Sequence, residues 1–327
     1  MQNKKITYTD IISIENLLCA WREFQKGKRK RKDVQIFQLH LMDNVFDLHL
    51  DLKNKTYSHG GYEEFHISDP KPRVIHKASV RDRLLHHAMY RILYPYFDKQ
   101  FIHDSYSCRL GKGTHKACNR FRYFSRKVSQ NNTRTCWVLQ CDVRKFFASI
   151  DHQILLDEIK KYSDIDIDTL WLIENVVRSF QSTEEGKGLP LGNLTSQLLV
   201  NIYANKLDQY IKHALRMKYY IRYADDFVFL SQNKDELEVV LVMVRNFLKN
   251  ELRLQLHPNK VFLKTLGSGV DFLGWVHFPI HRVLRTATKR KMMCKLKNNP
   301  RKKTVQLYLG LLGWGNTYKL KNKINMI

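Results

Sequence analysis

Three aspartates are the residues of this sequence with the clearest capacity for chemistry. Asp225 and Asp226 are adjacent and lie between two apolar, strand-like runs, 219–223 and 227–230. Asp142 ends another apolar run. Because Asp favours turns, an Asp-Asp pair at a hairpin tip is by itself equally consistent with turn formation and with function. Two adjacent carboxylates on a buried sheet nevertheless repel each other unless a cation binds.

If the strand ending at Asp142 lies beside the hairpin that carries Asp225 and Asp226, the three carboxylates converge. Mg²⁺ prefers oxygen ligands in octahedral geometry and keeps some waters and phosphate oxygens. Two ions roughly 3.5–4 Å apart stabilise the attacking and leaving oxygens of an in-line displacement. The aspartates therefore predict a two-metal centre for nucleotidyl transfer, with Mg²⁺ as the expected ion and Mn²⁺ as a substitute. One ion would activate a primer 3′-hydroxyl, and the other would hold a triphosphate.

The elements expected around these aspartates are strands embedded among helices. Apolar patterns predict a strand at 136–143, a hairpin at 219–231 and strands within 260–277, with extended pieces in 57–77. Strands with acidic ends among helices predict an α+β fold, with an antiparallel sheet packed on helices. Helical spacing is found at 10–25 (with Asp10 as a cap), 33–52, 80–99, 113–130, 152–161 (capped by Asp151), 167–180, 195–215, 234–252, 287–298 and 303–316.

Positive charge is the strongest global signal. The chain has 56 Lys and Arg against 31 Asp and Glu, a formal net charge of +25. A generally basic, Lys-rich proteome would explain part of this excess but not its clustering at 26–32 and 289–303. Both clusters are expected to contact phosphates, which gives affinity for nucleic acid without sequence specificity.

Other features limit the class of protein. The 327 residues are enough for two or three lobes, but too few for a polymerase core with a full nuclease domain. The 6 Cys include no C-x-x-C pair, so a zinc ribbon is not expected. Segment 10–24 has amphipathic helical spacing rather than that of a signal peptide, and no apolar run is long enough to span a membrane. A cytoplasmic location is expected.

Five segments occur in the order and spacing of reverse-transcriptase motifs: LQCDVRKFFASIDH, GLPLGNLTSQLLVNIYANKLD, IRYADDFVFLS, HPNKVFL and VDFLGW. The box Tyr223-Ala224-Asp225-Asp226 resembles the family's Tyr-x-Asp-Asp motif. The resemblance extends from about residue 60 to the C-terminus. It implies a right-hand polymerase fold and synthesis of DNA from dNTPs on a template RNA, with an RNA/cDNA duplex as product. It also implies a metal site formed by Asp142, Val143, Asp225 and Asp226.

The resemblance assigns roles to further residues. Phe147, five residues after Asp142, resembles the steric gate that excludes a ribose 2′-hydroxyl, although it could instead be a core Phe. Lys71 and Arg73 are similar to residues that bind the incoming triphosphate, and Arg109 is similar to a second basic motif. Lys260 is similar to a lysine that could protonate the pyrophosphate leaving group. Each of these basic residues could alternatively be a solvated surface charge.

The family pattern also divides the chain into lobes. The helices after 287 would form a thumb that holds the duplex through its backbone, with Lys289 and Arg290 among the contacts. The expected lobes are an N-terminal helical and basic extension at 1–55, fingers at 56–135, a palm at 136–277 (with 152–192 partly in the fingers) and a short helical thumb at 278–327.

One departure narrows the resemblance. Most reverse transcriptases have Pro-Gln-Gly where this chain has Pro190-Leu191-Gly192, and here Gln197 follows Ser196. This pattern resembles reverse transcriptases of diversity-generating retroelements, relatives of the group II intron type. It implies that Leu191 and Gly192 lie at the dNTP and that Asn193 and Gln197 contact nucleic acid.

Leu191 bears on fidelity, because leucine has no hydrogen-bonding group with which to check the nascent base pair. We therefore expect errors opposite template adenines, unless Leu191 only packs beneath the nucleotide. The subfamily also implies a structured retroelement RNA and a small basic accessory protein that forms an oligomer. Mutagenic retrohoming into a variable target gene would be the biological role.

Three other readings of the sequence stay open. The chain could be a defence-associated or intron-type reverse transcriptase, although only about 50 residues follow VDFLGW, where intron enzymes usually carry a maturase extension. A non-catalytic RNA-binding protein on the same fold would be expected to have lost carboxylates, and all three are present. An RNA-making polymerase is disfavoured by the bulky Phe147.

Overall fold

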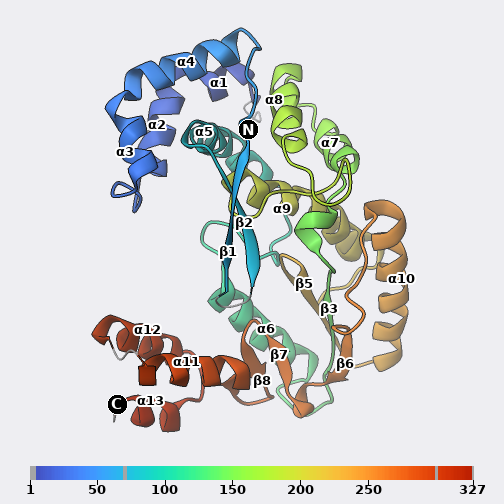
Figure 1. Cartoon of the computed structure of the whole chain (residues 1–327). Helices are drawn as coiled ribbons and strands as arrows, with labels where there is room; N and C mark the ends of the chain where they lie inside the picture. Colours follow the sequence, from blue (N-terminus) through green and yellow to red (C-terminus); the bar gives the residue numbers. More distant parts are fainter. Residues whose placement is uncertain (1–4, 69–71, 299–300, 326–327) are drawn as a thin grey trace. The chain divides into compact units, whose positions relative to one another are not determined.

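The computed structural model describes residues 5–68, 72–298 and 301–325 (Figure 1). These residues form two compact units, and the chain passes between them several times. Unit 1 comprises Met1–His103, Arg144–Tyr210 and Phe247–Gln255. Unit 2 comprises Asp104–Val143, Ile211–Asn246 and Leu256–Ile327. Among the described helices, none has the length and apolar character needed to cross a bilayer.

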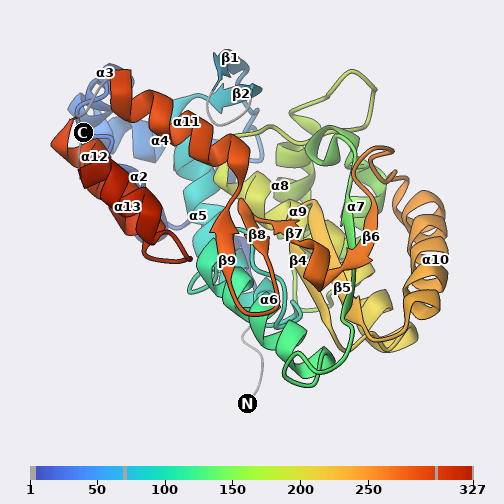
Figure 2. The same ribbon diagram turned by 90° about the horizontal axis from the view of Figure 1, so that it is seen from below.

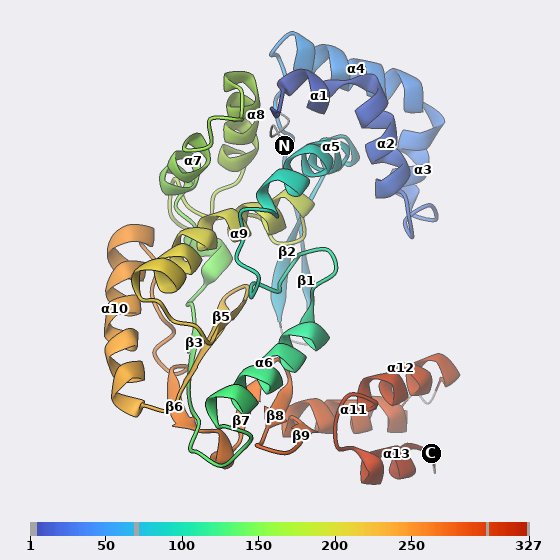
Figure 3. The same cartoon turned by 180° about the vertical axis from the view of Figure 1, so that it is seen from behind.

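Unit 1 is mainly helical. The buried helix α5 packs against both α2 and α9 (Figure 3). A two-stranded antiparallel ribbon projects from these helices, with Tyr62 paired to Ala78 at one end and Ile67 paired to Arg73 at the other. The elements are α1 (Tyr8–Ile12), α2 (Ile14–Phe24), α3 (Lys32–Leu39), α4 (Leu41–Lys53), β1 (Tyr62–Ile67), β2 (Arg73–Ala78), α5 (Val80–Phe97), α7 (His152–Lys160), α8 (Ile167–Arg178) and α9 (Leu194–Gln209).

Two helices expected from the sequence are each broken in two. The segment 10–25 divides at Ser13, whose side chain caps α2 by accepting a hydrogen bond from the Asn16 N–H. Thr7, and not Asp10, caps α1, so the cap expected at Asp10 is wrong. The segment 33–52 divides at His40, which leaves helical backbone geometry between α3 and α4.

At Ser13 the side-chain hydrogen bond competes with the helical ladder, whereas His40 makes no side-chain cap hydrogen bond. By contrast, the cap expected at Asp151 is confirmed, because its carboxylate accepts from the Ile154 N–H at 3.1 Å.

Unit 2 contains a four-stranded antiparallel sheet in the order β4-β5-β3-β6. The apolar strands expected from the sequence form its centre. Helix α6 packs on the sheet (Figure 1). Its Phe121, Phe124 and Val128 belong to one buried cluster with Val138 and Val228 of the sheet. The elements are α6 (Thr114–Val128), β3 (Trp137–Asp142), β4 (Tyr220–Tyr223), β5 (Asp226–Ser231), α10 (Lys234–Leu252) and β6 (Phe262–Thr265).

The C-terminal part of unit 2 is a three-stranded meander followed by three helices (Figure 2). It contains β7 (Val270–Phe272), β8 (Trp275–His277), β9 (Arg282–Leu284), α11 (Thr286–Asn298), α12 (Lys302–Leu312) and α13 (Tyr318–Asn325). The sequence did not predict β9 or α13. The helix expected at 303–316 stops at Leu312, whose carbonyl accepts a hydrogen bond from the Thr317 hydroxyl. Trp275, Met292 and Leu296 lie in one buried cluster there.

Two glycines give a matched test of this packing. A Cβ on Gly315 would lie 2.2 Å from Cζ3 of Trp275 and 3.0 Å from the Arg282 carbonyl oxygen, whereas a Cβ on Gly310 meets nothing within 4 Å. Gly315→Ala should lower the free energy of unfolding by about 1–3 kcal/mol through overpacking. Gly310→Ala should be neutral or stabilising by up to about 1 kcal/mol, because Ala favours a helix interior. Urea unfolding of both variants measures the difference, and equal stabilities would contradict the packing described.

Candidate active site

The antiparallel pairing of β3 with β5 places two of the three aspartates opposite each other. The register pairs Asp142 with Asp226, Cys141 with Phe227 and Leu139 with Phe229. The apolar partners are buried, and Asp142 itself is only 7% exposed. Because a shift by one residue would turn every apolar side chain to the opposite face, burial of these strands fixes the register. The sheet therefore holds the two carboxylates at one point.

The third aspartate lies in the tight turn between β4 and β5. Tyr223 pairs with Asp226, which leaves a two-residue loop of Ala224 and Asp225. Ala224 has φ of 55°, the left-handed backbone that such hairpin turns require. The Asp225 carbonyl accepts a hydrogen bond from the Val143 N–H at 3.1 Å. The end of β3 is thus fastened to the turn, and Asp225 lies beside the Asp142–Asp226 pair.

A buried arginine that the sequence did not single out supports this turn. Arg222 is 1% exposed. Its guanidinium donates to the Ser105 hydroxyl at 3.1 Å and to the Ala224 carbonyl at 3.4 Å. Arg109, expected to contact nucleic acid, donates to the Ser105 carbonyl at 3.1 Å and so holds the same segment. The Arg-Tyr-Ala-Asp-Asp string itself was the only available sequence signal for Arg222.

The aspartate cluster is electrostatically unfavourable without a cation. Burial, then the charges of Asp225 and Asp142, raise the pKa of Asp226 to about 7. The Lys260 ammonium lies 2.9 and 3.0 Å from the two carboxylate oxygens of Asp142. The Asp142 carbonyl also accepts a 2.7 Å hydrogen bond from the His257 N–H. Lys260 therefore lies within the acidic cluster, where its charge offsets part of the repulsion.

The donor chemistry of the cluster fits a divalent cation. Three carboxylates on one sheet edge supply the hard oxygen ligands that Mg²⁺ and Mn²⁺ prefer. As the side chains lie, the described residues contain no group of three or more His, Cys, Asp or Glu side chains arranged to hold an ion. Both Asp142 oxygens contact Lys260 instead. The carboxylates of Asp142 and Asp226 also share a side-chain hydrogen bond, so these two ligand groups already lie side by side.

Several residues that the resemblance assigned to nucleotide binding gather in unit 1. Loop 191–193 is fastened to β2, because the Leu191 carbonyl accepts from the His76 N–H at 2.9 Å and the Asn193 amide donates to the His76 carbonyl at 3.0 Å. Gly192 has φ of 107°, and a Cβ there would lie 2.7 Å from Cγ2 of Ile75. Glycine is therefore required at this position. Gly192, Asn193 and Gln197 line one cavity.

Phe147 lies in a short 3₁₀ turn, Phe146–Ser149, that follows the strand bearing Asp142. Phe146 is 5% exposed and belongs to the core, whereas Phe147 is half-buried. Their rings meet edge to face at 6.1 Å. The Phe147 carbonyl accepts from the Leu189 N–H at 2.9 Å, which fixes the backbone of the turn. Of the two neighbouring aromatics, Phe147 is thus the one with surface available for a ligand.

The remaining expected residues are exposed or lie outside the described part of the chain. Arg73 is exposed at the start of β2, and Lys71 lies outside the described residues. Lys289 and Arg290 are exposed in the first turns of α11. Unit 2 thus brings together Asp142, Asp225, Asp226 and Lys260, and unit 1 brings together the loop 191–193 and Gln197.

Comparison with known proteins identifies the class. Residues 66–277 match the family described as reverse transcriptase (RNA-dependent DNA polymerase). The chain belongs to this family, the RNA-directed DNA polymerases. It is similar to Protein YkfC of Escherichia coli (strain K12), with 26% identity over 274 residues that cover 72% of this chain and 69% of that one. It is also similar to the Group II intron-encoded protein LtrA of Lactococcus lactis subsp. cremoris, with 21% identity over 68% of this chain and 48% of LtrA.

Solved structures agree on the fold. Apo telomerase from Candida tropicalis matches with a TM-score of 0.53 and 12% identity, over 68% of this chain and 48% of that chain. Telomerase from Candida albicans matches with a TM-score of 0.52 and 9% identity, over 77% of this chain and 51% of that chain. The fold is a right-hand polymerase fold. The chain spans about half the length of these structures and of LtrA.

The Lys260–Asp142 contact can be tested without any reaction. In EDTA, we expect Lys260→Gln and Asp142→Asn to show a coupling of about 1 kcal/mol in a double-mutant cycle of urea unfolding. This value is small for a charge pair because the Lys260 side chain is 43% exposed. Lys264→Gln, on the neighbouring strand β6, should show no coupling to Asp142→Asn. If the Lys260 and Asp142 effects add within about 0.3 kcal/mol, the ion pair does not form in solution.

Proposed function

We propose that this chain copies a template RNA into DNA, using Asp142, Asp225 and Asp226 to bind two Mg²⁺ ions, with Mn²⁺ as a substitute. The observation that supports this most is the pairing of Asp142 with Asp226 across β3 and β5, beside the Asp225 turn, in a member of the reverse transcriptase family. Isolated carboxylates in a loop would not be held this way. The Val143 carbonyl is a fourth proposed ligand.

The protein groups have separate roles in this proposal. Bound divalent ions supply charge that favours an ionised 3′-hydroxyl and a leaving pyrophosphate. Burial and acidic neighbours raise the pKa of Asp226, and a cation nearby would favour its ionised form. Lys260 would exchange its contact with Asp142 for the triphosphate and could then donate a proton to the departing oxygen.

Further residues are proposed to bind and select the nucleotide. Lys71 and Arg73 would hold the triphosphate, since both belong to the basic stretch KPRVIHK of residues 71–77. The half-buried ring of Phe147 would exclude ribonucleotides. Lys289 and Arg290 on α11 would contact the backbone of the RNA/cDNA duplex, consistent with their exposure. The expected division into an extension (1–55), fingers (56–135), palm (136–277) and thumb (278–327) is retained as part of the proposal.

We further propose membership of the diversity-generating type, which rests on Leu191 and Gln197. The backbone of Leu191 is fastened to β2, while its side chain has no polar atom to offer a nucleotide. Misincorporation at template adenines, a structured retroelement RNA, a basic accessory oligomer and a cytoplasmic location belong to this proposal. A defence-associated or intron-type enzyme is the second candidate, and similarity to LtrA favours the intron type.

Primer extension tests the polymerase proposal. With an RNA template, a DNA primer, dNTPs and Mg²⁺, the protein should extend the primer. Asp226→Asn should lower the rate at least about 10³-fold, because one carboxylate of the metal site is lost while shape and packing are kept. Asp235→Asn, an exposed aspartate in the first turn of α10, is the matched control and should leave the rate unchanged. Equal extension by wild-type protein and Asp226→Asn would disprove the proposal.

Leu191→Gln tests the error-prone role. Glutamine restores a hydrogen-bonding side chain at the nucleotide, and a hydrogen bond that discriminates between bases is worth roughly 1–3 kcal/mol, about 5- to 150-fold in selectivity. Misincorporation opposite adenine should therefore fall in the variant, as read by sequencing cDNA copied from a defined RNA. Leu191→Met, which keeps the position apolar, should behave as wild type. An unchanged error spectrum in Leu191→Gln would show that Leu191 has no part in fidelity.

A further inference from the structure

Helix α4 has two apolar faces. One is buried where α4 packs against α1, α2 and α3, and it contains Val45, Leu48 and Leu52. The other is exposed and contains Met42, Phe46 and Leu50, which are four residues apart and therefore lie in one row along the helix. Single exposed apolar side chains are ordinary, whereas a group of them marks a surface for interaction.

The exposed row continues into α3. Ile36 and Leu39 are three residues apart on α3, and only His40 separates Leu39 from the start of α4. We give the name α4 face to the whole row, whose members are between 43% and 78% exposed: Ile36, Leu39, Met42, Phe46 and Leu50. No other stretch of similar length in the part of the chain that the structure describes exposes as many large apolar side chains.

The two helices that carry the α4 face are fastened to the core of unit 1. The Trp21 indole N–H of α2 donates to the Gln38 side chain of α3 at 3.1 Å, and the rings of Trp21 and Phe37 lie 5.0 Å apart. The Asn44 amide of α4 donates to the Phe37 carbonyl of α3 at 3.1 Å. The α4 face is therefore a preformed surface, and a partner would not have to order it on binding.

The segment that carries the α4 face is acidic, although the chain as a whole is strongly basic. Residues 33–52 contain four Asp and no Lys or Arg, in a chain with a formal net charge of +25. Lys53 follows at the C-terminal end of α4, where a positive charge complements the helix dipole. The sign of the local charge is thus opposite to that of the whole chain.

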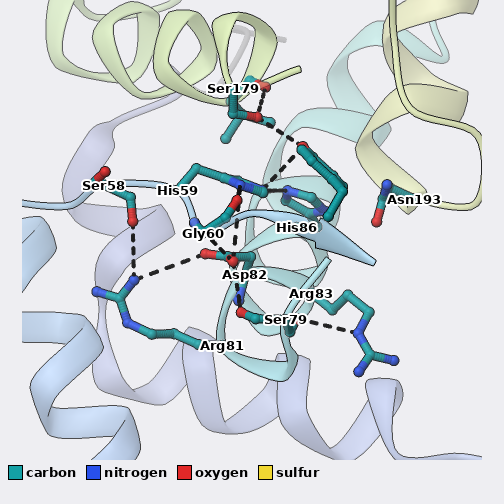
Figure 4. Close-up of polar contacts among 12 residues, drawn as sticks. Ser58, His59, Gly60, Ser79, Arg81, Asp82, Arg83, His86, Ser179 and Asn193 are labelled. Atoms are coloured by element: carbon teal, nitrogen blue, oxygen red, sulfur yellow. Dashed lines mark hydrogen bonds and ion pairs between the residues drawn. The ribbon is translucent and has the colours of Figure 1, made fainter. Parts of the chain in front are cut away.

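Two of these four aspartates are neutralised from within unit 1. Asp33 pairs with Arg83 at 2.7 Å, and Asp51 pairs with Arg81. Figure 4 shows both arginines in the first turn of α5, where Arg81 also donates to the Ser58 carbonyl at 3.4 Å. Asp33 and Asp51 therefore hold α3 and α4 onto α5 and have little charge left for a partner.

The other two aspartates, Asp43 and Asp47, are exposed and form no ion pair with any residue that the structure describes. They are four residues apart on α4, and each directly follows a member of the α4 face, Met42 or Phe46. Like charges at this spacing disfavour each other, and a cation between them would relieve the repulsion. An apolar row is thus bordered by two carboxylates that lack a counter-charge.

This charge pattern selects among the possible occupants of the α4 face. Nucleic acid and anionic lipid headgroups would be repelled by Asp43 and Asp47. A second copy, packed antiparallel about a two-fold axis at Phe46, would bring the four carboxylates of the two copies together. A protein surface that is apolar in the middle and carries Lys or Arg at its edge has neither problem, because it buries the apolar row and supplies the missing counter-charge.

We propose that the α4 face docks a protein partner through an amphipathic helix with a basic edge. The apolar side chains of that helix cover Leu39, Met42 and Phe46, and its Lys or Arg side chains pair with Asp43 and Asp47. The rest of this basic chain repels such a helix, so electrostatics direct it to the one acidic place. No residue of the proposed polymerase site takes part, so the docking proposal stands or fails independently of polymerase activity.

Two synthetic peptides test the chemistry of the partner. One is an amphipathic helix of Leu and Lys, about 18 residues long so that it can be helical, and the other has Glu in place of every Lys. Fluorescence anisotropy at fixed ionic strength measures the binding of each to the whole chain. The Lys peptide should bind more tightly, although the net charge of +25 alone favours the Glu peptide. If the Glu peptide binds equally or more tightly, the proposal is wrong.

Variants locate the binding of the Lys peptide. Leu39→Ser/Phe46→Ser should weaken it at least about tenfold, because both apolar anchors are lost. Asp43→Asn/Asp47→Asn should weaken it roughly fivefold at low salt, as expected for exposed charge pairs. Helix α10 supplies matched controls, Val242→Ser (55% exposed) and Asp235→Asn/Glu238→Gln, which should each have less than about a twofold effect. Equal losses in the controls would show that the α4 face is no specific docking site.

Two further measurements test the other occupants. Sedimentation equilibrium should give the same association state for the wild-type chain and for Leu39→Ser/Phe46→Ser. A dimer that only the wild-type chain forms would show that the α4 face pairs with a second copy, and the proposal would be wrong. Phosphatidylcholine vesicles should bind both proteins equally weakly. Vesicle binding that the variant loses would assign the α4 face to a lipid surface instead.

Discussion

The pairing of Asp142 with Asp226 across two apolar strands is the constraint on which the rest of the structure depends. The strands are stable because their side chains are buried, and that burial fixes the register which brings the carboxylates together. The same burial, followed by the charges of Asp225 and Asp142, raises the pKa of Asp226 to about 7. The sheet therefore holds the carboxylates together despite their mutual repulsion. Such tension between folding and charge is common at functional sites, where a bound ion relieves it.

The surrounding elements can be understood as support for this arrangement. Arg222 and the Val143 N–H fasten the turn that carries Asp225, and the His257 N–H fastens the end of β3. Lys260 supplies a positive charge at Asp142. A mobile ammonium suits such a place better than a guanidinium, because it can leave one oxygen for another without losing a two-pronged geometry. Lys260 is therefore the ion-pair partner of Asp142 in this structure and, in the proposed reaction, the proton donor to the pyrophosphate.

Much of the local structure was predictable because it depends on periodic burial. The strand at 136–143 and the hairpin at 219–231 follow from continuous apolar runs, and the Asp151 cap follows from helix chemistry. The breaks at Ser13 and His40 were missed, since the periodicity continues across them. A side-chain hydrogen bond ends the helical run at Ser13, and a non-helical backbone conformation ends it at His40. Strand β9 was missed because three residues are too few to show a period.

The residues of the candidate site also divide into those that the sequence predicts and those that it does not. The acidic trio and Gly192 are recognisable from motifs contiguous in sequence. Arg222 and the cavity lined by Gly192, Asn193 and Gln197 are not, because both depend on contacts between segments far apart in the chain. Lys28, Phe65, His86 and Asn193 come from four different elements, and no spacing relates them. The basic segment 26–32 predicts affinity for phosphate, but only the fold shows that Lys28 and Arg31 are the two of its residues that line a cavity.

Direct counting of bound ions tests the central claim most closely. Mn²⁺ titration followed by electron paramagnetic resonance, with template, a 3′-deoxy primer and dNTP present, reports how many ions the protein itself retains. Two protein-dependent Mn²⁺ sites are expected in wild-type protein, with the loss of at least one in Asp142→Asn or Asp226→Asn. The same number of tightly bound ions in wild-type protein and in both variants would contradict the account, because the paired aspartates would then hold no metal.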